Sequence, residues 1–110
     1  MEHGEQEVIG TVREAEVEAH LRRLVESKGG RCVKFLSEYS RGWPDRLVLL
    51  PRGVSCWVEL KTTGGRLAPA QLVAHQDLRG LGQRVEVVWT KDQAERLVEA
   101  LTGVEVNISK

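Results

Sequence analysis

Two acidic side chains and a lysine are spaced so that neighbouring strands would bring them together. Asp45 directly follows Pro44, and Glu59 and Lys61 come later in the chain with a single leucine between them. On a β-strand, side chains two positions apart project from the same face, so Glu59 and Lys61 would share one face. A pair of carboxylates beside an ammonium group is the chemistry of a site for a divalent cation and an anion.

The intervening sequence predicts the strand pair that would position these side chains. Residues 46–50 and 54–58 are rich in aliphatic residues, and 51–53 is Pro-Arg-Gly, which is typical of a tight turn in which glycine supplies a positive φ. With a loop of 51–53, Asp45 lies directly opposite Glu59 in an antiparallel pair. Opposed residues have Cβ atoms roughly 4.5–5.5 Å apart, where like charges repel. The fold would gain no stability from this pairing.

A divalent cation between Asp45 and Glu59 would turn that repulsion into coordination, so we predict a metal site. Carboxylate oxygens favour a hard cation, Mg²⁺ or Mn²⁺. A zinc site is not indicated, because His3, His20 and His75 are scattered singly. The sequence leaves open whether one ion or two would bind.

The composition is that of a single globular domain. The chain has 110 residues, with hydrophobic and charged contents close to the average, and no apolar run approaches the length of a membrane span. Its 16 basic and 16 acidic residues cancel, which argues against a protein that coats nucleic acid by bulk charge. The polar N-terminus is not a signal peptide. Cys32 and Cys56 could pair, but reduced core thiols in a cytoplasmic protein are the favoured interpretation.

Periodicity predicts seven elements along the chain. They are a helix at 11–28, strands at 31–37, 46–50 and 54–58, a helix at 69–81, a strand at 85–89, and a helix from a capping box at 90–93 to Gly103. We therefore expect a flexible N-terminus at 1–10, one domain at 11–103 and a tail at 104–110. Strands separated by a crossover helix predict an α/β fold, a mixed four-stranded sheet flanked by helices.

Three runs in order resemble a known family. Gly-Trp-Pro-Asp-Arg at 42–46, Val-Glu-Leu-Lys at 58–61 and Gly-Gly-Arg-Leu-Ala-Pro-Ala-Gln at 64–71 resemble the VRR-NUC branch of the PD-(D/E)XK nucleases, especially its small stand-alone phage-type members. The resemblance extends from about residue 14 to about residue 101. It implies an αβββαβ restriction-endonuclease-like core, to which this chain would add a C-terminal helix, and a bacterial or phage-encoded intracellular protein.

The resemblance also implies roles for the motif residues. The main-chain carbonyl of Leu60 would join Asp45 and Glu59 as a metal ligand. Lys61 would hold or help deprotonate the attacking water, or stabilise charge on the phosphate. Gln71, in the first turn of the helix at 69–81, would orient water or phosphate.

The first helix contributes an acid whose identity stays open. The apolar stripe of this helix centres close to Glu14, whereas Glu18 lies at its edge. A glutamate within an apolar stripe is costly to bury unless something pairs with it. VRR-NUC proteins place an acid in this helix, and either residue fits that pattern. We favour Glu14, which would reach the metal directly or through water; first-turn exposure is the alternative.

Basic and aromatic side chains beside the motifs are candidates for DNA contacts. Four cations lie in or next to the motif segments and could contact phosphates, with scattered solvated charge as the alternative: Lys34, Arg41, Arg46 and Arg66. His75, one turn beyond Gln71 on the same helix face, is a further candidate for the site. Trp43 is expected to pack or to anchor its loop, and stacking on an unpaired base is the alternative.

These expectations together predict a metal-dependent, structure-selective DNA endonuclease. No element resembles a base-reading helix, which favours readout of branched DNA through backbone and shape. The resemblance implies a Holliday-junction resolvase-like homodimer, with two active sites for paired cuts. The alternatives are a flap- or nick-type nuclease and a non-catalytic nucleic-acid-binding module. The sequence leaves open a replication or repair partner for targeting, since no motif names one.

Overall fold

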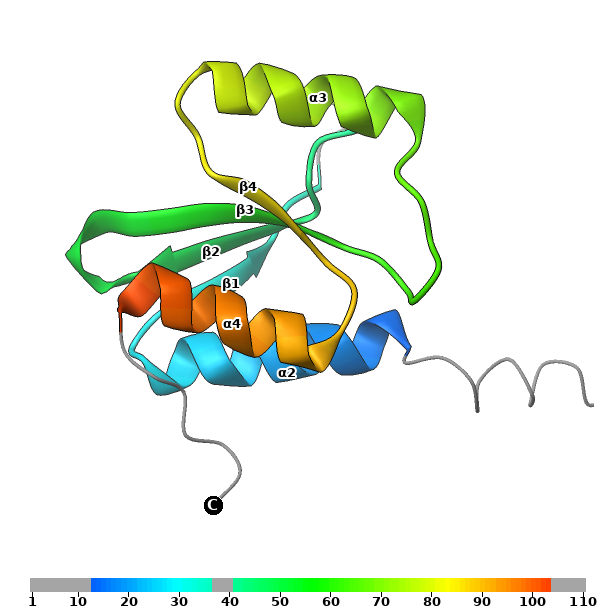
Figure 1. Ribbon diagram of the computed structural model, residues 1–110. Helices are drawn as coiled ribbons and strands as arrows, with labels where there is room; N and C mark the ends of the chain where they lie inside the picture. Colours follow the sequence, from blue (N-terminus) through cyan, green and yellow to red (C-terminus); the bar gives the residue numbers. More distant parts are fainter. Residues whose placement is uncertain (1–12, 37–40, 104–110) are drawn as a thin grey trace, which may run out of the picture.

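The computed structural model describes residues 13–36 and 41–103. Within them, four strands form one mixed sheet (Figure 1). The strand order is β1 (Arg31–Lys34), β2 (Arg46–Leu50), β3 (Val54–Leu60) and β4 (Val85–Val88). The first three strands are antiparallel neighbours, and β4 lies parallel to β3. The predicted mixed four-stranded sheet is confirmed.

Three helices cover the sheet on both faces. Helices α2 (Glu14–Ser27) and α4 (Lys91–Thr102) lie side by side on one face, and α3 (Pro69–Gly80) lies on the other (Figure 1). The predicted α/β order, with its additional C-terminal helix, is confirmed. Within the described residues no helix combines the length and apolar character needed to cross a lipid bilayer. The expected flexible N-terminus at 1–10 and tail at 104–110 lie outside the described residues.

The core lies between the sheet and the α2–α4 layer. Alternate strand residues face this layer, and each is at most 1% exposed; examples are Val48, Val58 and Leu60. They meet the apolar stripe of α2, in which Val17 and Leu21 have no exposed surface. Burying a side chain of this size contributes roughly 1.5–3 kcal/mol. Strand β3 is therefore held firmly from one side, while its other face carries Ser55, Trp57 and Glu59.

The turn between β2 and β3 sets the register that the sequence predicted. Residues Pro51–Gly53 form a single 3₁₀ turn, Leu50 pairs with Val54 next to it, and the ladder runs to the Arg46–Val58 pair. Extending this register by one residue places Asp45 across from Glu59, as expected. Gly53 has the predicted positive φ of 76°.

Several element ends differ from the predicted ones by a few residues. Strand β1 ends at Lys34 rather than continuing to 37, although the Phe35 amide still donates to the Asp45 carbonyl at 2.9 Å. Helix α4 begins with Thr90 Oγ1 accepting from the Gln93 amide, as a capping box requires. The Gln93 side chain, however, accepts from the Trp89 amide and not from that of Thr90.

The face of the sheet that carries α3 is only partly covered. Val33 pairs with Leu47 and Leu47 with Trp57 in the ladders, so these side chains form a row on this face, with Leu49 beside it. Val33 and Leu49 remain 41% and 40% exposed. We call these four residues the open face. Beyond its edge, Phe35 and Trp43 stack at 5.7 Å, and both contact the Trp57 ring edge-on.

Candidate active site

Asp45 and Glu59 lie where β2 begins and β3 ends, and each has one oxygen held by the protein. Asp45 Oδ2 lies 3.6 Å from the Arg46 guanidinium, and Glu59 Oε2 accepts a 3.1 Å hydrogen bond from Gln71 Nε2. The other two oxygens, Asp45 Oδ1 and Glu59 Oε1, are buried and have no hydrogen-bond partner within the part of the chain that the structure describes. Buried polar atoms are rarely left unpaired. Neither oxygen accepts a hydrogen bond from the described protein, so each keeps at least one lone pair that could bind a ligand.

Arg46 ties Asp45 to helix α2. Its Nε lies 3.5 Å from Glu18 Oε2, and its Nη1 donates to the Asp45 carbonyl at 3.0 Å. Glu18 also pairs with Arg22 one turn further along α2. The Arg46 side chain is only 12% exposed, so its guanidinium is engaged with protein carboxylates. The phosphate contact expected of Arg46 stays a prediction, and the structure gives this side chain a second role in holding Asp45.

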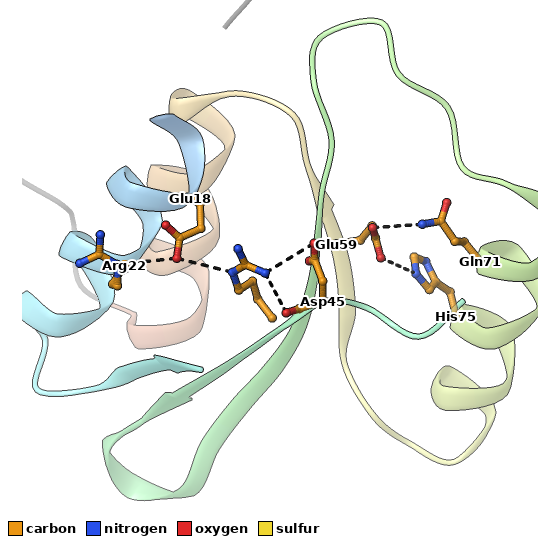
Figure 2. A network of polar contacts seen from close by, with 7 residues as sticks. Glu18, Arg22, Asp45, Glu59, Gln71 and His75 are labelled. Atoms are coloured by element: carbon orange, nitrogen blue, oxygen red, sulfur yellow. Dashed lines mark hydrogen bonds and ion pairs between the residues drawn. The ribbon is translucent and has the colours of Figure 1, made fainter. Parts of the chain in front are cut away.

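Helix α3 holds Glu59 from the other side of the sheet. Gln71 Oε1 accepts from the Ala68 amide at 2.8 Å, which turns the amide nitrogen of Gln71 towards Glu59. One turn later, His75 Nε2 lies 3.6 Å from Glu59 Oε1 (Figure 2). Residues four apart on a helix face the same way. The sequence placed Gln71 and His75 on one face, and the structure shows that this face meets Glu59.

The loop that carries Asp45 packs directly onto the start of α3. Gly42 has a φ of +80°, and a Cβ atom at this position would lie 2.3 Å from the Ala70 carbonyl oxygen. No side chain larger than hydrogen fits this contact. Pro44 is fully buried behind it. Glycine here lets β2 start close enough to α3 for Asp45 to share a site with residues of that helix.

The charges around Glu59 act on its ionisation. Burial is the largest cause that raises the pKa of Glu59 from 4.5 to about 7, and the negative charge of Asp45 adds to the rise. Lys61 and Arg46 lower this pKa, and Glu14 raises it. Glu14 and Lys61 are thus near enough to interact with Glu59.

The two candidate acids of the first helix have different surroundings. Glu14 is half-buried at the start of α2 and contributes negative potential at Glu59, whereas Glu18 is engaged with Arg22 and Arg46. This difference supports Glu14 over Glu18 as the residue available to a metal or its water. Ligation by Glu14 stays a prediction.

The donor set fits a hard, hydrated cation. No group of three or more Asp, Glu, His or Cys side chains that could hold a metal occurs within residues 13–36 and 41–103. The protein therefore offers Asp45 and Glu59, each with one unpaired oxygen. Mg²⁺ is typically bound by one or two carboxylates and keeps several waters, to which substrate phosphates add. The expected role of the Leu60 carbonyl, between Glu59 and Lys61, stays a prediction.

The other predicted DNA-contacting cations lie on the surface. Lys34 pairs with Arg46 in the β1–β2 ladder and is exposed. Arg41 and Arg66 are also exposed, the first next to Gly42 and the second in the connection to α3. Trp89 Nε1 donates to the Gly65 carbonyl at 3.1 Å and so ties this connection to the end of β4.

Comparisons with known proteins point to one family, although no family model matches the chain. "Putative nuclease p44" of Acyrthosiphon pisum secondary endosymbiont phage 1 is 43% identical over 81 residues, which span 74% of this chain and 87% of that protein. A solved structure described as "VRR_NUC domain" is similar with a TM-score of 0.73 and 36% sequence identity. The matched region covers 78% of this chain and 94% of the chain in that solved structure.

Replacing Glu59 with glutamine is expected to stabilise the metal-free protein at alkaline pH. A carboxyl whose pKa rises on folding stabilises the native state below its unfolded pKa of 4.5, and this contribution is lost as pH rises through about 7. Above pH 7 the wild type bears a buried charge that Glu59→Gln lacks. We expect a gain of about 1–3 kcal/mol at pH 8 and little change at pH 5, measured by urea unfolding in EDTA.

A matched control is Glu86→Gln, at a half-exposed surface pair with Arg84. Such pairs contribute little, so this change should be nearly neutral at both pH values. Equal effects of Glu59→Gln at pH 5 and pH 8 would contradict the assignment of a buried, ionising Glu59.

Replacing Gly42 with alanine is expected to destabilise the fold by roughly 2 kcal/mol or more. The added Cβ atom would both strain the positive φ and displace the Ala70 carbonyl. Gly82→Ala is the control, because Gly82 has a similar φ of +84° with nothing within 4 Å. Thermal unfolding of both variants measures the difference. Equal losses would mean that the loop does not depend on its contact with α3.

Proposed function

Because the chain belongs to the VRR-NUC family of nucleases, we propose that it is a Mg²⁺- or Mn²⁺-dependent endonuclease that cuts branched DNA. The observation that carries this proposal is the pair of opposed acids, Asp45 and Glu59, each with one buried oxygen left unpaired. The positive charge of Lys61 acts on the same site.

Each side chain of the site would have a separate role in phosphodiester hydrolysis. Asp45 and Glu59 would hold the cation, which when bound polarises the phosphate and lowers the pKa of water. Lys61 stabilises the charge that develops on the phosphate oxygens, or holds the attacking water. Arg46 and Gln71 keep the two carboxylates in place.

DNA would approach along exposed cations near the site, and its shape would decide selectivity. Lys34, Arg41 and Arg66 are exposed and available for phosphate contacts. The chain as a whole carries no net charge, so its non-specific affinity for duplex should be low. A neutral protein with few cations near its site favours a substrate whose backbone geometry brings several phosphates together, such as a branch point.

We propose a symmetric homodimer that uses the open face. A monomer of this size rarely leaves a row of large apolar side chains in water, yet Val33 and Leu49 are each about 40% exposed. A second copy offers the same row, and with no net charge on the chain the two copies do not repel. Two active sites related by a two-fold axis would suit paired cuts in a four-way junction.

Cleavage of defined DNA structures tests the enzyme proposal. We expect the protein to cut a labelled four-way junction faster than duplex, with Mg²⁺ or Mn²⁺ and not in EDTA. Asp45→Ala and Lys61→Ala should each lower the rate by at least roughly 100-fold, because each removes a group that acts on the reacting phosphate or its cation. Binding without cleavage by the wild type would instead support a non-catalytic module.

Calorimetric titration with Mn²⁺ separates the roles within the site. Glu59→Ala should weaken metal binding, since it removes a ligand. Lys61→Ala should leave metal binding largely intact, since it removes only a neighbouring cation. The reverse result would overturn both role assignments.

Light scattering after size-exclusion chromatography tests the dimer. The wild type should elute as a dimer, and Leu49→Asp should produce monomers because it places a charge within the proposed contact. Leu81→Asp is the control, as Leu81 is 75% exposed at the end of α3 and outside the open face. A wild type that is monomeric at all concentrations would remove the resolvase-like proposal and favour a flap- or nick-type nuclease.

A further inference from the structure

The geometry around helix α3 points to a second residue that controls the acid on β3. We propose that His75 is a positioning residue for Glu59, donating from Nε2 to Glu59 Oε1 and fixing the carboxylate for metal binding. This inference rests on the proposed function, because it concerns the same site. It assigns His75 no contact with DNA or with the cation.

His75 is buried and has no hydrogen-bond partner of its own. Its side chain is 1% exposed, and neither Nδ1 nor Nε2 has a hydrogen-bond partner within residues 13–36 and 41–103. The polar atom that its Nε2 approaches is Glu59 Oε1, at 3.6 Å, an atom that is itself buried and unpaired. Figure 2 shows the imidazole directed at this carboxylate from α3. A movement of less than 1 Å would bring the two atoms to the usual hydrogen-bond distance of about 2.9 Å.

Stability does not account for a histidine at this position. Its helix neighbours Ala74 and Leu78 are buried and apolar. An imidazole with both nitrogens unpaired in such surroundings costs free energy that a leucine of similar size would not. Residues that lower the stability of a fold are expected mainly at functional sites.

The two α3 side chains restrain different oxygens of Glu59. Gln71 binds Oε2 at 3.1 Å, and its own orientation is fixed by the Ala68 amide. That hydrogen bond alone leaves the carboxylate free to rotate about it. An imidazole at Oε1 removes this freedom, so the carboxylate would meet a cation already oriented. Groups that hydrogen-bond to metal-binding carboxylates commonly change metal affinity by 10- to 100-fold when they are removed.

Metal titration of two His75 variants provides the test. His75→Leu should unfold at the same or a higher temperature than the wild type in EDTA, yet bind Mn²⁺ about tenfold more weakly by calorimetry. His75→Gln, which keeps an N–H donor near the Nε2 position, should recover most of that affinity. His20→Gln is the control, because His20 pairs with Glu95 between α2 and α4 and should alter stability alone. Wild-type affinity in His75→Leu, or no recovery in His75→Gln, would overturn the proposal.

A double-mutant cycle in EDTA tests the same contact without metal or DNA. The unfolding temperatures of His75→Leu, Glu59→Ala and the double variant should be non-additive if the two side chains interact. Additive shifts would overturn the inference even if the protein cuts DNA. Conversely, non-additive shifts with no cleavage of any substrate would reject the nuclease proposal and leave the role of His75 towards Glu59 intact.

Discussion

The structure depends on keeping one buried carboxylate beside another at the meeting point of β2 and β3. Glu59 is only 5% exposed and faces the negative charge of Asp45, and these two conditions raise its pKa to about 7. The flanking residues of the same strand, Val58 and Leu60, turn the other way and are buried in the core. Alternation along β3 thus lets one face supply the hydrophobic free energy that offsets the charge on the opposite face.

Both acids are anchored from outside the strand pair, and by different layers of the fold. Asp45 is linked through Arg46 to Glu18 on α2, whereas Glu59 is linked to Gln71 on α3. These helices lie on opposite faces of the sheet (Figure 1). The site is therefore a junction of three layers, and its geometry depends on how each helix packs. Arg46 and Gln71 each contact one oxygen of their carboxylate, so one oxygen of each acid accepts no hydrogen bond within the described residues.

The sequence could predict features that depend on residues close together in the chain, and not those that depend on contacts between distant elements. The opposition of Asp45 and Glu59 depends only on the three-residue turn between the strands, so the expected register is confirmed. Periodicity could not separate Glu14 from Glu18, because the difference between them comes from the contact of Glu18 with Arg46 across two elements. The burial of His75 likewise depends on α3 crossing the sheet, which no local pattern encodes. The pairing of Arg46 with Glu18 is non-local in the same way, so its part in holding Asp45 could not be predicted from the sequence.

The incomplete cover of the sheet bears on the site through Trp43. This ring stacks on Phe35 and meets Trp57 at the edge of the open face, and it stands two positions before Asp45 in a loop that Gly42 docks onto α3. A partner copy on the open face would press on this aromatic group from the solvent side. In the proposed homodimer this contact would reach Asp45, because Trp43 packs on Phe35 and Trp57, and Gly42 packs on Ala70. Assembly and the geometry at Asp45 would then be coupled, while each proposed active site still takes its side chains from a single copy.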